Sequence, residues 1–295
     1  MKKTLLILLI FFTAALKGFA QDMDDFLNSA SADETTFSSA TFKATRIVNG
    51  QSIERMKYGQ LDFRIHHRFG YLNSGVDNFF GVDQATTFLG LEYGINDRLM
   101  CGIGRSAYQK TVSGFLKYAL LLQHSGKSNM PVTLVLFANT EIQTAPWTNT
   151  AQTNYTSSRF SYVYQALVAH KFNERFSLQL SPTIVHKNIV KEVVDPNDIF
   201  ALGIGGRMKI SKRVSFNAEY YYQFNPTRID GKDMPNSLSL GFDLETGGHV
   251  FQLFVTNSQP IQENGFITQT SGRWKDGDVL FGFNISRSFS LFNKP

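Results

Sequence analysis

Apolar and polar side chains alternate with a period of two along most of the chain after Gly59. In residues 61–69, for example, Leu, Phe, Ile, His and Phe alternate with Asp, Arg, His and Arg. Neighbouring side chains of a strand point to opposite sides, so each such segment predicts a strand with two different faces. Similar segments occur at 86–93, 99–105, 112–123, 132–142, 160–170, 176–187, 200–210, 214–224, 238–245, 250–258 and 279–289. The sequence therefore predicts an all-β protein of about twelve strands.

The lengths of the connections between these segments indicate how the strands are arranged. The connections at 94–98, 172–175, 211–213 and 247–249 are short, and those at 71–84, 143–158, 188–197, 225–236 and 259–277 are long. Short and long connections mostly alternate, as in antiparallel up-and-down transmembrane β-barrels with short periplasmic turns and longer external loops. The connections at 106–110 and 124–131 depart from this order. An additional hairpin at 45–54, around Asn49-Gly50, would raise the strand count to fourteen.

Alternation alone does not show which face points outward. The apolar face is large and aromatic, its aromatic residues gather at the strand ends, and the opposite face is rich in Gly, Ser, Asn and charged residues. This distribution favours an apolar face on lipid and a polar face around a narrow wet lumen. After residue 20 no run of about 18 apolar residues could form a membrane-spanning helix. The alternative is a soluble or membrane-associated β-barrel that carries an apolar ligand inside.

The N-terminal residues predict export. Lys2 and Lys3 precede an apolar run at 5–12, and Gly18 and Ala20 provide the small residues of a signal-peptidase site. We expect a cleaved signal peptide at 1–20, a flexible acidic tail at 21–40, an N-terminal segment at 41–58 that adds a hairpin or a plug, and a β-barrel at 59–295. The expected location is the cell outer membrane.

Residues 61–70 end in His-Arg-Phe-Gly and resemble a strand of uncharacterised outer-membrane β-barrel proteins of Bacteroidetes. Members of that family share a signal peptide and an N-terminal segment similar to residues 42–56. The resemblance covers most of the mature chain. It implies the barrel fold and the outer-membrane location, and it transfers no functional residues because the family carries no assigned activity.

The polar face supplies the candidate site residues. The alternation places these charged and titratable side chains toward the lumen: Asp62, Arg64, His66, Arg68, Glu92, Glu141, Arg207, Lys209, Glu219, Asp243 and Glu245. One interpretation is a narrow channel with a charge-selective constriction for small polar solutes, or an anion site on the four basic residues Arg64, Arg68, Arg207 and Lys209. The other is a salt-bridge network that only satisfies buried charges in a structural or ligand-binding barrel.

Catalysis is not predicted. A rim-located lipid hydrolase would need a His beside a Ser, and His170 with Ser161 or His186 with Ser181 are the available pairs, but neither lies in a recognisable motif. His66 and His67 are adjacent and face opposite sides of a strand, so they cannot share a metal ion. No phosphate-binding glycine loop precedes a helix. We therefore expect no cofactor and no metal.

The expected partners follow from the predicted location. They are outer-membrane lipid and the barrel-insertion machinery, because residues 282–289 alternate and end in Phe289, similar to the segment by which outer-membrane barrels are recognised. Loss of Lys2, Lys3 and Lys17 with the signal peptide leaves 26 basic residues against 24 acidic ones, so nucleic acid is not an expected partner. Cys101 is the only cysteine and allows no intrachain disulfide. We expect a monomer.

Overall fold

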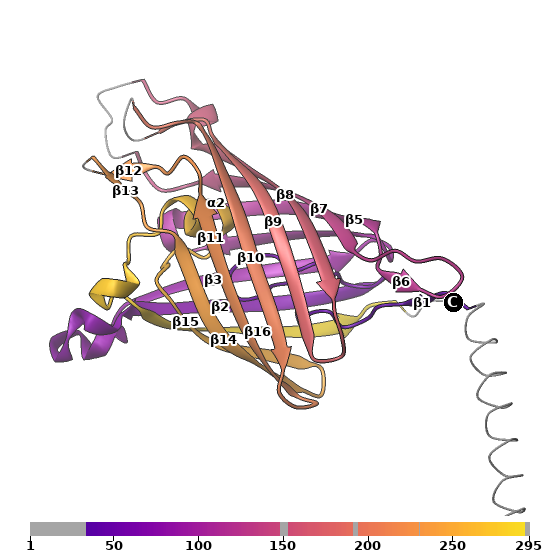
Figure 1. Ribbon diagram of the computed structural model, residues 1–295. Helices are drawn as coiled ribbons and strands as arrows, with labels where there is room; N and C mark the ends of the chain where they lie inside the picture. The colour runs from indigo at the N-terminus through magenta and orange to yellow at the C-terminus, as the bar shows by residue number, and fades with distance from the viewer. Residues whose placement is uncertain (1–33, 148–152, 191–193, 230, 293–295) are drawn as a thin grey trace, which may run out of the picture.

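A closed β-barrel forms the body of the protein (Figure 1). The computed structural model describes residues 34–147, 153–190, 194–229 and 231–292. Within them twelve antiparallel strands make the wall, which confirms the predicted fold and the lower strand count. The wall strands are β2 (Gln60–Tyr71), β3 (Ala85–Gly94), β4 (Leu99–Ser106), β5 (Thr111–Leu121), β7 (Thr133–Gln143), β8 (Phe160–Lys171), β9 (Phe176–Lys187), β10 (Asp198–Lys209), β11 (Val214–Gln223), β14 (Ser237–Thr246), β15 (His249–Thr256) and β16 (Leu280–Ser290).

Each wall strand pairs with its neighbour in sequence, and β16 closes the barrel by pairing with β2, from Gln60 opposite Ser290. The first and last wall strands therefore meet at the rim that carries the short turns, which we call the short-turn rim. At two of these turns an Asn side chain accepts the N–H groups of the residues two and three positions later, Asn96 at both 2.8 Å and Asn173 at 2.8 and 2.9 Å. Such side-chain contacts fix tight turns locally. The opposite end, with the longer connections, is called the long-loop rim.

The smaller elements lie in the connections. Short strand pairs form between β1 (Thr36–Phe37) and β6 (His124–Ser125), and between β12 (Arg228–Ile229) and β13 (Lys232–Asp233). Short 3₁₀-helical segments occur at η1 (Leu72–Ser74), η2 (Val76–Gly81), η3 (Tyr108–Lys110), η4 (Thr156–Arg159) and η5 (Trp274–Asp276), and the described residues contain one α-helix, α2 (Glu263–Thr268). In the described part of the chain, no helix is both long and apolar enough to cross a bilayer.

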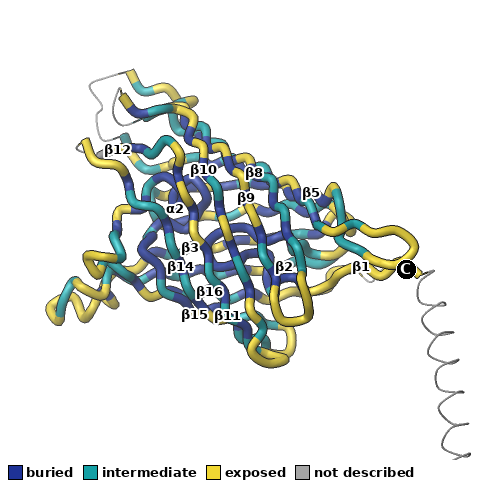
Figure 2. Tube along the Cα trace, in the orientation of Figure 1, coloured by how far each residue is buried: buried dark blue, intermediate teal, exposed yellow. Residues whose placement is uncertain are grey.

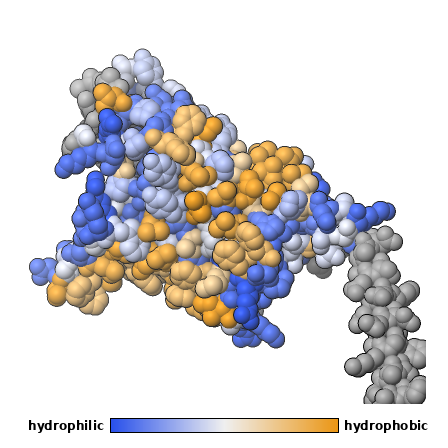
Figure 3. Space-filling view, in the orientation of Figure 1, coloured by the Kyte–Doolittle hydropathy of each residue, from blue (hydrophilic) through white to orange (hydrophobic). Residues whose placement is uncertain are grey.

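The apolar face of the wall points outward. Ile204 and Phe242, at mid-strand positions, expose 42% and 47% of their surface, whereas the alternate positions are buried. Large exposed aromatic side chains also lie at the strand ends, such as Phe224 and Phe200 toward the long-loop rim and Phe176 toward the short-turn rim. Apolar side chains cover much of the wall in Figure 3, and hydrophilic ones gather at loop and turn tips. The predicted orientation of the two faces is confirmed.

The interior is filled by two segments of the same chain. Residues 41–56, here called the N-terminal plug, enter from the short-turn rim, and residues 257–270, here called the inner loop, fold in from the long-loop rim and contain α2. Most residues of both segments are buried, and the α2 part of the inner loop is dark blue in Figure 2. The expected narrow wet lumen is wrong for this conformation, because the chain supplies its own filling.

The N-terminal plug contains the hairpin that the sequence suggested, with an antiparallel bridge between Arg46 and Gln51. This hairpin stands inside the barrel and adds no strand to the wall. Residues 36–37 pair with β6 outside the barrel, so this end of the expected flexible tail at 21–40 has a partner. The expected signal peptide at 1–20 and residues 21–33 of the expected tail lie outside the described residues.

Apolar contacts hold the plug near the short-turn rim. Phe42, Ile47 and Ile53 of the plug belong to one buried cluster with Phe115 and Phe137 of the wall. These wall residues interrupt the polar character of the inward face. Burial of large side chains of this kind stabilises by roughly 1.5–3 kcal/mol each. The plug is therefore packed in the barrel by the hydrophobic effect as well as by polar contacts.

Candidate functional site

The structure places the predicted polar candidates on the inner side of the wall. Nine of them are buried, namely Asp62, Arg64, His66, Arg68, Glu92, Glu141, Arg207, Glu219 and Asp243. Lys209 and Glu245 are partly exposed near the short-turn rim, where Glu245 forms an ion pair with Lys43. Of the four basic residues proposed as an anion site, Arg64, Arg68 and Arg207 have separate partners within the protein. Lys209 is half-buried near the short-turn rim.

Several of these charges bind the backbone of the plug. The Glu219 carboxylate accepts the N–H groups of Val48, Asn49 and Gly50 at 3.2, 2.7 and 3.0 Å. Three consecutive N–H groups around one anion form a favourable nest for negative charge. Arg207 donates to the carbonyl oxygens of residues 40 and 41 at 2.7 and 3.1 Å. These charged side chains therefore bind backbone N–H and C=O groups of the plug that have no neighbouring strand to pair with.

One positively charged residue that binds the backbone of the plug was not among the residues predicted from the sequence. Lys117 on β5 is buried and donates from Nζ to the carbonyl oxygens of Thr45, Ser52 and Glu54 at 3.1–3.2 Å. It shares its face with Phe115 and with an alanine, which conceals the polar character of that face. Lys117 lies at one of the alternate positions of β5 that point inward, and this position alone could have indicated its place in the interior.

A second group of inward-facing wall residues forms ion pairs within the wall. Arg64 Nε lies 2.7 Å from Asp62 and 3.1 Å from Glu92, and Glu92 accepts the Thr45 hydroxyl of the plug at 2.5 Å. Arg68 donates to the Asn49 side chain at 2.7 Å. Buried charges are tolerated where such partners satisfy them. Arg64, Asp62 and Glu92 therefore form a buried salt-bridge network, as one of the two interpretations of the inner charges expects.

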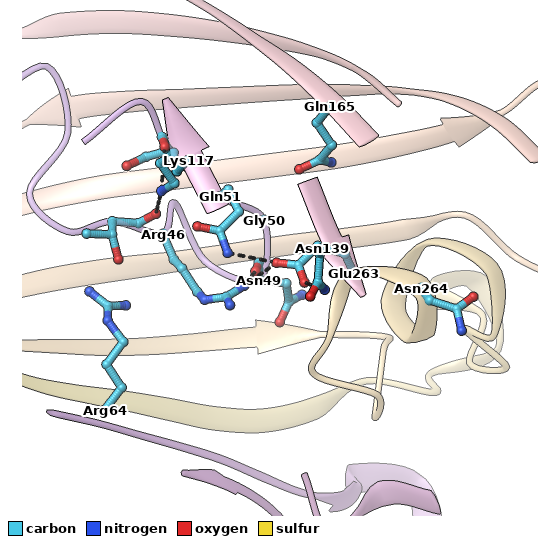
Figure 4. A network of polar contacts seen from close by, with 12 residues as sticks. Arg46, Asn49, Gly50, Gln51, Arg64, Lys117, Asn139, Gln165, Glu263 and Asn264 are labelled. Carbon is cyan, nitrogen blue, oxygen red and sulfur yellow. Dashed lines mark hydrogen bonds and ion pairs between the residues drawn. The ribbon is translucent and has the colours of Figure 1, made fainter. Parts of the chain in front are cut away.

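The plug and the inner loop meet at Glu263, which is the first residue of α2 and lies in no strand pattern. One Glu263 oxygen lies 2.6 Å from Arg46 Nη1 and accepts Gln51 Nε2 at 2.9 Å, and the other accepts Asn139 Nδ2 at 2.8 Å (Figure 4). Arg46 and Glu263 are 3% and 1% exposed. This buried ion pair joins the segment that enters from one rim to the segment that enters from the other.

Asn139 also links Glu263 to Glu141, one of the predicted candidates. Glu141 accepts Asn139 Nδ2 at 3.1 Å and the backbone N–H of Asn264 at 3.0 Å. The Asn264 side chain donates to Ser161 at 3.0 Å. The inner loop is therefore bound to β7 and β8 by neutral and charged hydrogen bonds.

His66 lacks comparable partners. Its ring is 1% exposed and lies 5.1 Å from the ring of Phe88, and neither ring nitrogen has a hydrogen-bond partner among the described residues. The sequence placed His66 correctly on the inward row of β2. Its contacts are aromatic rather than polar.

Beyond the inner loop, toward the long-loop rim, lies a cavity of about 470 Å³, which we call the vestibule. Asn264 and Thr268 of α2 line it on the side of the plug, and Tyr108, Gln143 and Trp147 line it from the loops and strand ends. Glu141 also lines it. Volumes of this size are typical of small-molecule sites.

The structure does not bring the candidate catalytic pairs together. His170 and Ser161 lie on the same strand, nine residues apart, which corresponds to about 30 Å. His186 and Ser181 are five residues apart on β9 and so face opposite sides of the wall. His186 instead lies 2.7 Å from Asp198. Among the residues that the structure describes, no group of His, Cys, Asp or Glu is arranged to hold a metal ion.

Comparison with known proteins identifies one family. Residues 42–289 match the family described as "Membrane bound beta barrel domain (DUF5777)". No curated protein sequence matches the chain. Similar solved structures include NanC porin, at 11% identity and a TM-score of 0.49 over 78% of this chain and 100% of that one.

KdgM porin is similar at 10% identity and a TM-score of 0.45, over 78% of this chain and 99% of that one. An outer membrane channel from Pseudomonas putida F1 is similar at 15% identity and a TM-score of 0.46, over 80% and 98%. At these values the three structures carry no inference about what this chain does.

Proposed function

Because the chain belongs to this family of membrane-bound β-barrel domains, we propose that it is a normally closed passage for small polar solutes and not an enzyme. The observation that carries the proposal is that the plug is not part of the wall. Within residues 41–56 the β-bridge joins two residues of the plug, Arg46 and Gln51. The plug contacts the wall through side chains, for example those of Glu219 and Lys117. These contacts can be broken, and the polar ones replaced by water, without breaking the barrel, because the strand pairing of the wall does not include the plug.

The plug is also attached in a way that allows withdrawal toward one side. Before it, residues 36–37 pair with β6, and after it Tyr58 pairs with Gly94, so both anchors lie at the short-turn rim. A segment fixed at both ends to one rim can leave the lumen as a loop. The wall would then present Lys117, Glu219 and Arg207 to water beside the apolar patch at Phe115 and Phe137, and the charged groups suit polar solutes.

Both the plug and the inner loop must leave the lumen in this proposal, because both occupy it, and the Arg46–Glu263 ion pair that joins them must break. Movement of the inner loop away from Glu141 would connect the vestibule to the lumen. The resting state is closed, since the residues at the junction are almost inaccessible to solvent.

We further propose an outer-membrane location, after export by the signal peptide at 1–20 and insertion by the barrel-insertion machinery, as a monomer surrounded by lipid. The apolar outer face and the closed barrel support this location, since only a closed barrel satisfies strand edges in a bilayer. The resemblance of residues 61–70 to Bacteroidetes barrels supports the same assignment.

Conductance in planar bilayers tests the passage. We would compare the full chain with three variants: one lacking residues 41–56, one with residues 259–270 replaced by a short Gly-Ser linker, and one with both changes. A matched control replaces the exposed residues 76–80 by the same linker. We expect stable current steps from the double variant and none from the full chain or the control.

Folding of each variant is checked by the heat-dependent gel mobility of the purified barrel. A double variant that is folded and inserted but never conducts would overturn the proposal. In that case the barrel would be a structural or ligand-binding component.

A further inference from the structure

We propose that the vestibule binds a polyhydroxylated molecule of one or two sugar rings that carries no positive charge. The inference names the ligand class of the proposed passage and rests on that function for its biological role. The binding itself requires only the closed barrel.

The cavity has the dimensions and the access that such a ligand needs. Its 470 Å³ falls in the range of about 300–1,000 Å³ that is usual for small-molecule sites. Gln143 and Pro146, which line it, are exposed, so the cavity communicates with solvent at the long-loop rim. Its inner side is closed by Asn264 and Thr268 of α2. A ligand therefore enters from the outside and rests on the inner loop.

Side-chain amides, hydroxyl groups and aromatic rings all contribute to the wall. Gln143 and Gln262 line the cavity, and the buried Nε2 of Gln262 has no hydrogen-bond partner within the described residues. An amide presents a donor and an acceptor side by side, which matches hydroxyl groups that both donate and accept. Tyr108 and Trp147 offer flat apolar faces that can pack against the C–H face of a sugar ring.

The charges of the wall are already engaged by the protein. Arg159 lies 4.0 Å above the Trp147 ring and donates to the carbonyl oxygens of Gln143 and Ala145 at 2.7 and 2.6 Å. Glu141 is bound by the amide groups described above, and Lys187 donates to Thr227 at 3.3 Å. The two cations exceed the single carboxylate, so a cationic ligand is disfavoured while a neutral one is accepted.

Titration of the purified full chain in detergent tests the inference, with intrinsic tryptophan fluorescence and calorimetry as readouts. The probes share one ring and differ in charge: glucose, glucuronate and glucosamine, with maltose for size and acetate for a bare carboxylate. We expect saturable binding of glucose and maltose, glucuronate at least as tight as glucose, and glucosamine weaker by about tenfold, the effect of 1.4 kcal/mol.

Two variants with matched controls locate the site. We expect Gln143→Ala to weaken maltose binding about fivefold, as for the loss of one neutral hydrogen bond. Trp147→Ala should weaken it about tenfold through lost aromatic packing. The controls Gln84→Ala and Tyr155→Ala change an exposed amide and an exposed aromatic residue outside the cavity and should leave binding unchanged.

Each other result overturns the inference. The inference fails if glucose and maltose do not bind saturably, or if glucosamine binds most tightly. It also fails if acetate binds as tightly as glucuronate, or if the vestibule variants and their controls have equal affinities. Failure of the conductance test with intact sugar binding would instead remove only the passage and leave the ligand site.

Discussion

Replacement Glu263→Gln isolates the ion pair that joins the plug to the inner loop. The change keeps the size of the side chain and one acceptor oxygen, and it removes the charge opposite Arg46 and one of the two acceptor atoms that Arg46, Gln51 and Asn139 use. Arg46 would then retain the Asn49 carbonyl at 3.0 Å as its described hydrogen-bond partner. Breaking one partner of a buried ion pair costs about 3–5 kcal/mol.

The lower end of that range is appropriate here, because glutamine still accepts hydrogen bonds. A loss of about 3 kcal/mol that acts only on the closed arrangement would raise the population of the released plug about a hundredfold, at 1.4 kcal/mol per factor of ten. The wall should be unaffected, since its strand ladder does not involve Glu263.

Amide hydrogen exchange of the barrel in detergent measures this effect segment by segment. Peptides that cover the plug contain the N–H groups bound to Glu219 and the internal pair Ser52 N–H to Thr45 O at 2.9 Å. We expect these amides to exchange about a hundredfold faster in Glu263→Gln, while peptides from β7 and β8 keep the wild-type rate.

Two further variants complete the experiment. Glu174→Gln makes the same chemical change at an exposed turn residue and should have no effect on the plug. Adding Arg46→Gln to Glu263→Gln removes the orphaned charge and should recover part of the protection. Unchanged plug exchange in Glu263→Gln, or equal acceleration in plug and wall, would refute the idea that this ion pair holds the plug closed.

Three other substitutions have defined outcomes. Gly50→Ala would place a Cβ 2.2 Å from the hydroxyl of the buried Tyr221, so the plug tip must shift; overpacking costs about 1–3 kcal/mol, and plug amides should exchange at least severalfold faster. Glu219→Gln removes an anion that binds three N–H groups and should lower the protection of the plug amides against exchange by roughly 1.5–3 kcal/mol. Unchanged protection would show that the Glu219 charge does not hold the plug. Ile204→Arg on the outer face should lower barrel stability in bilayers by roughly 2–4 kcal/mol in denaturant unfolding, and Val76→Arg in an exposed loop should not; similar values for both would contradict a lipid-facing Ile204.

Much of the barrel wall could be predicted from the sequence because its cause is local. The strand pleat sends successive side chains to opposite sides, so composition at alternate positions assigns each face wherever that composition is uniform. Turn residues such as Asn96 and Asn173 act within three residues of themselves. The same rule placed Glu219 and Arg207 toward the interior. It passed over Lys117, whose neighbours on the same face are apolar.

What fills the barrel was decided by the tertiary structure. Arg46 and Glu263 are separated by 217 positions, and neither lies in a periodic segment, so no local pattern relates them. Whether the hairpin at 45–54 joins the wall or stands inside it depends on partners such as Glu219 and Lys117, which only closure of the barrel brings around it. Alternation sets the direction of a side chain, whereas its partner is set by the three-dimensional path of the whole chain.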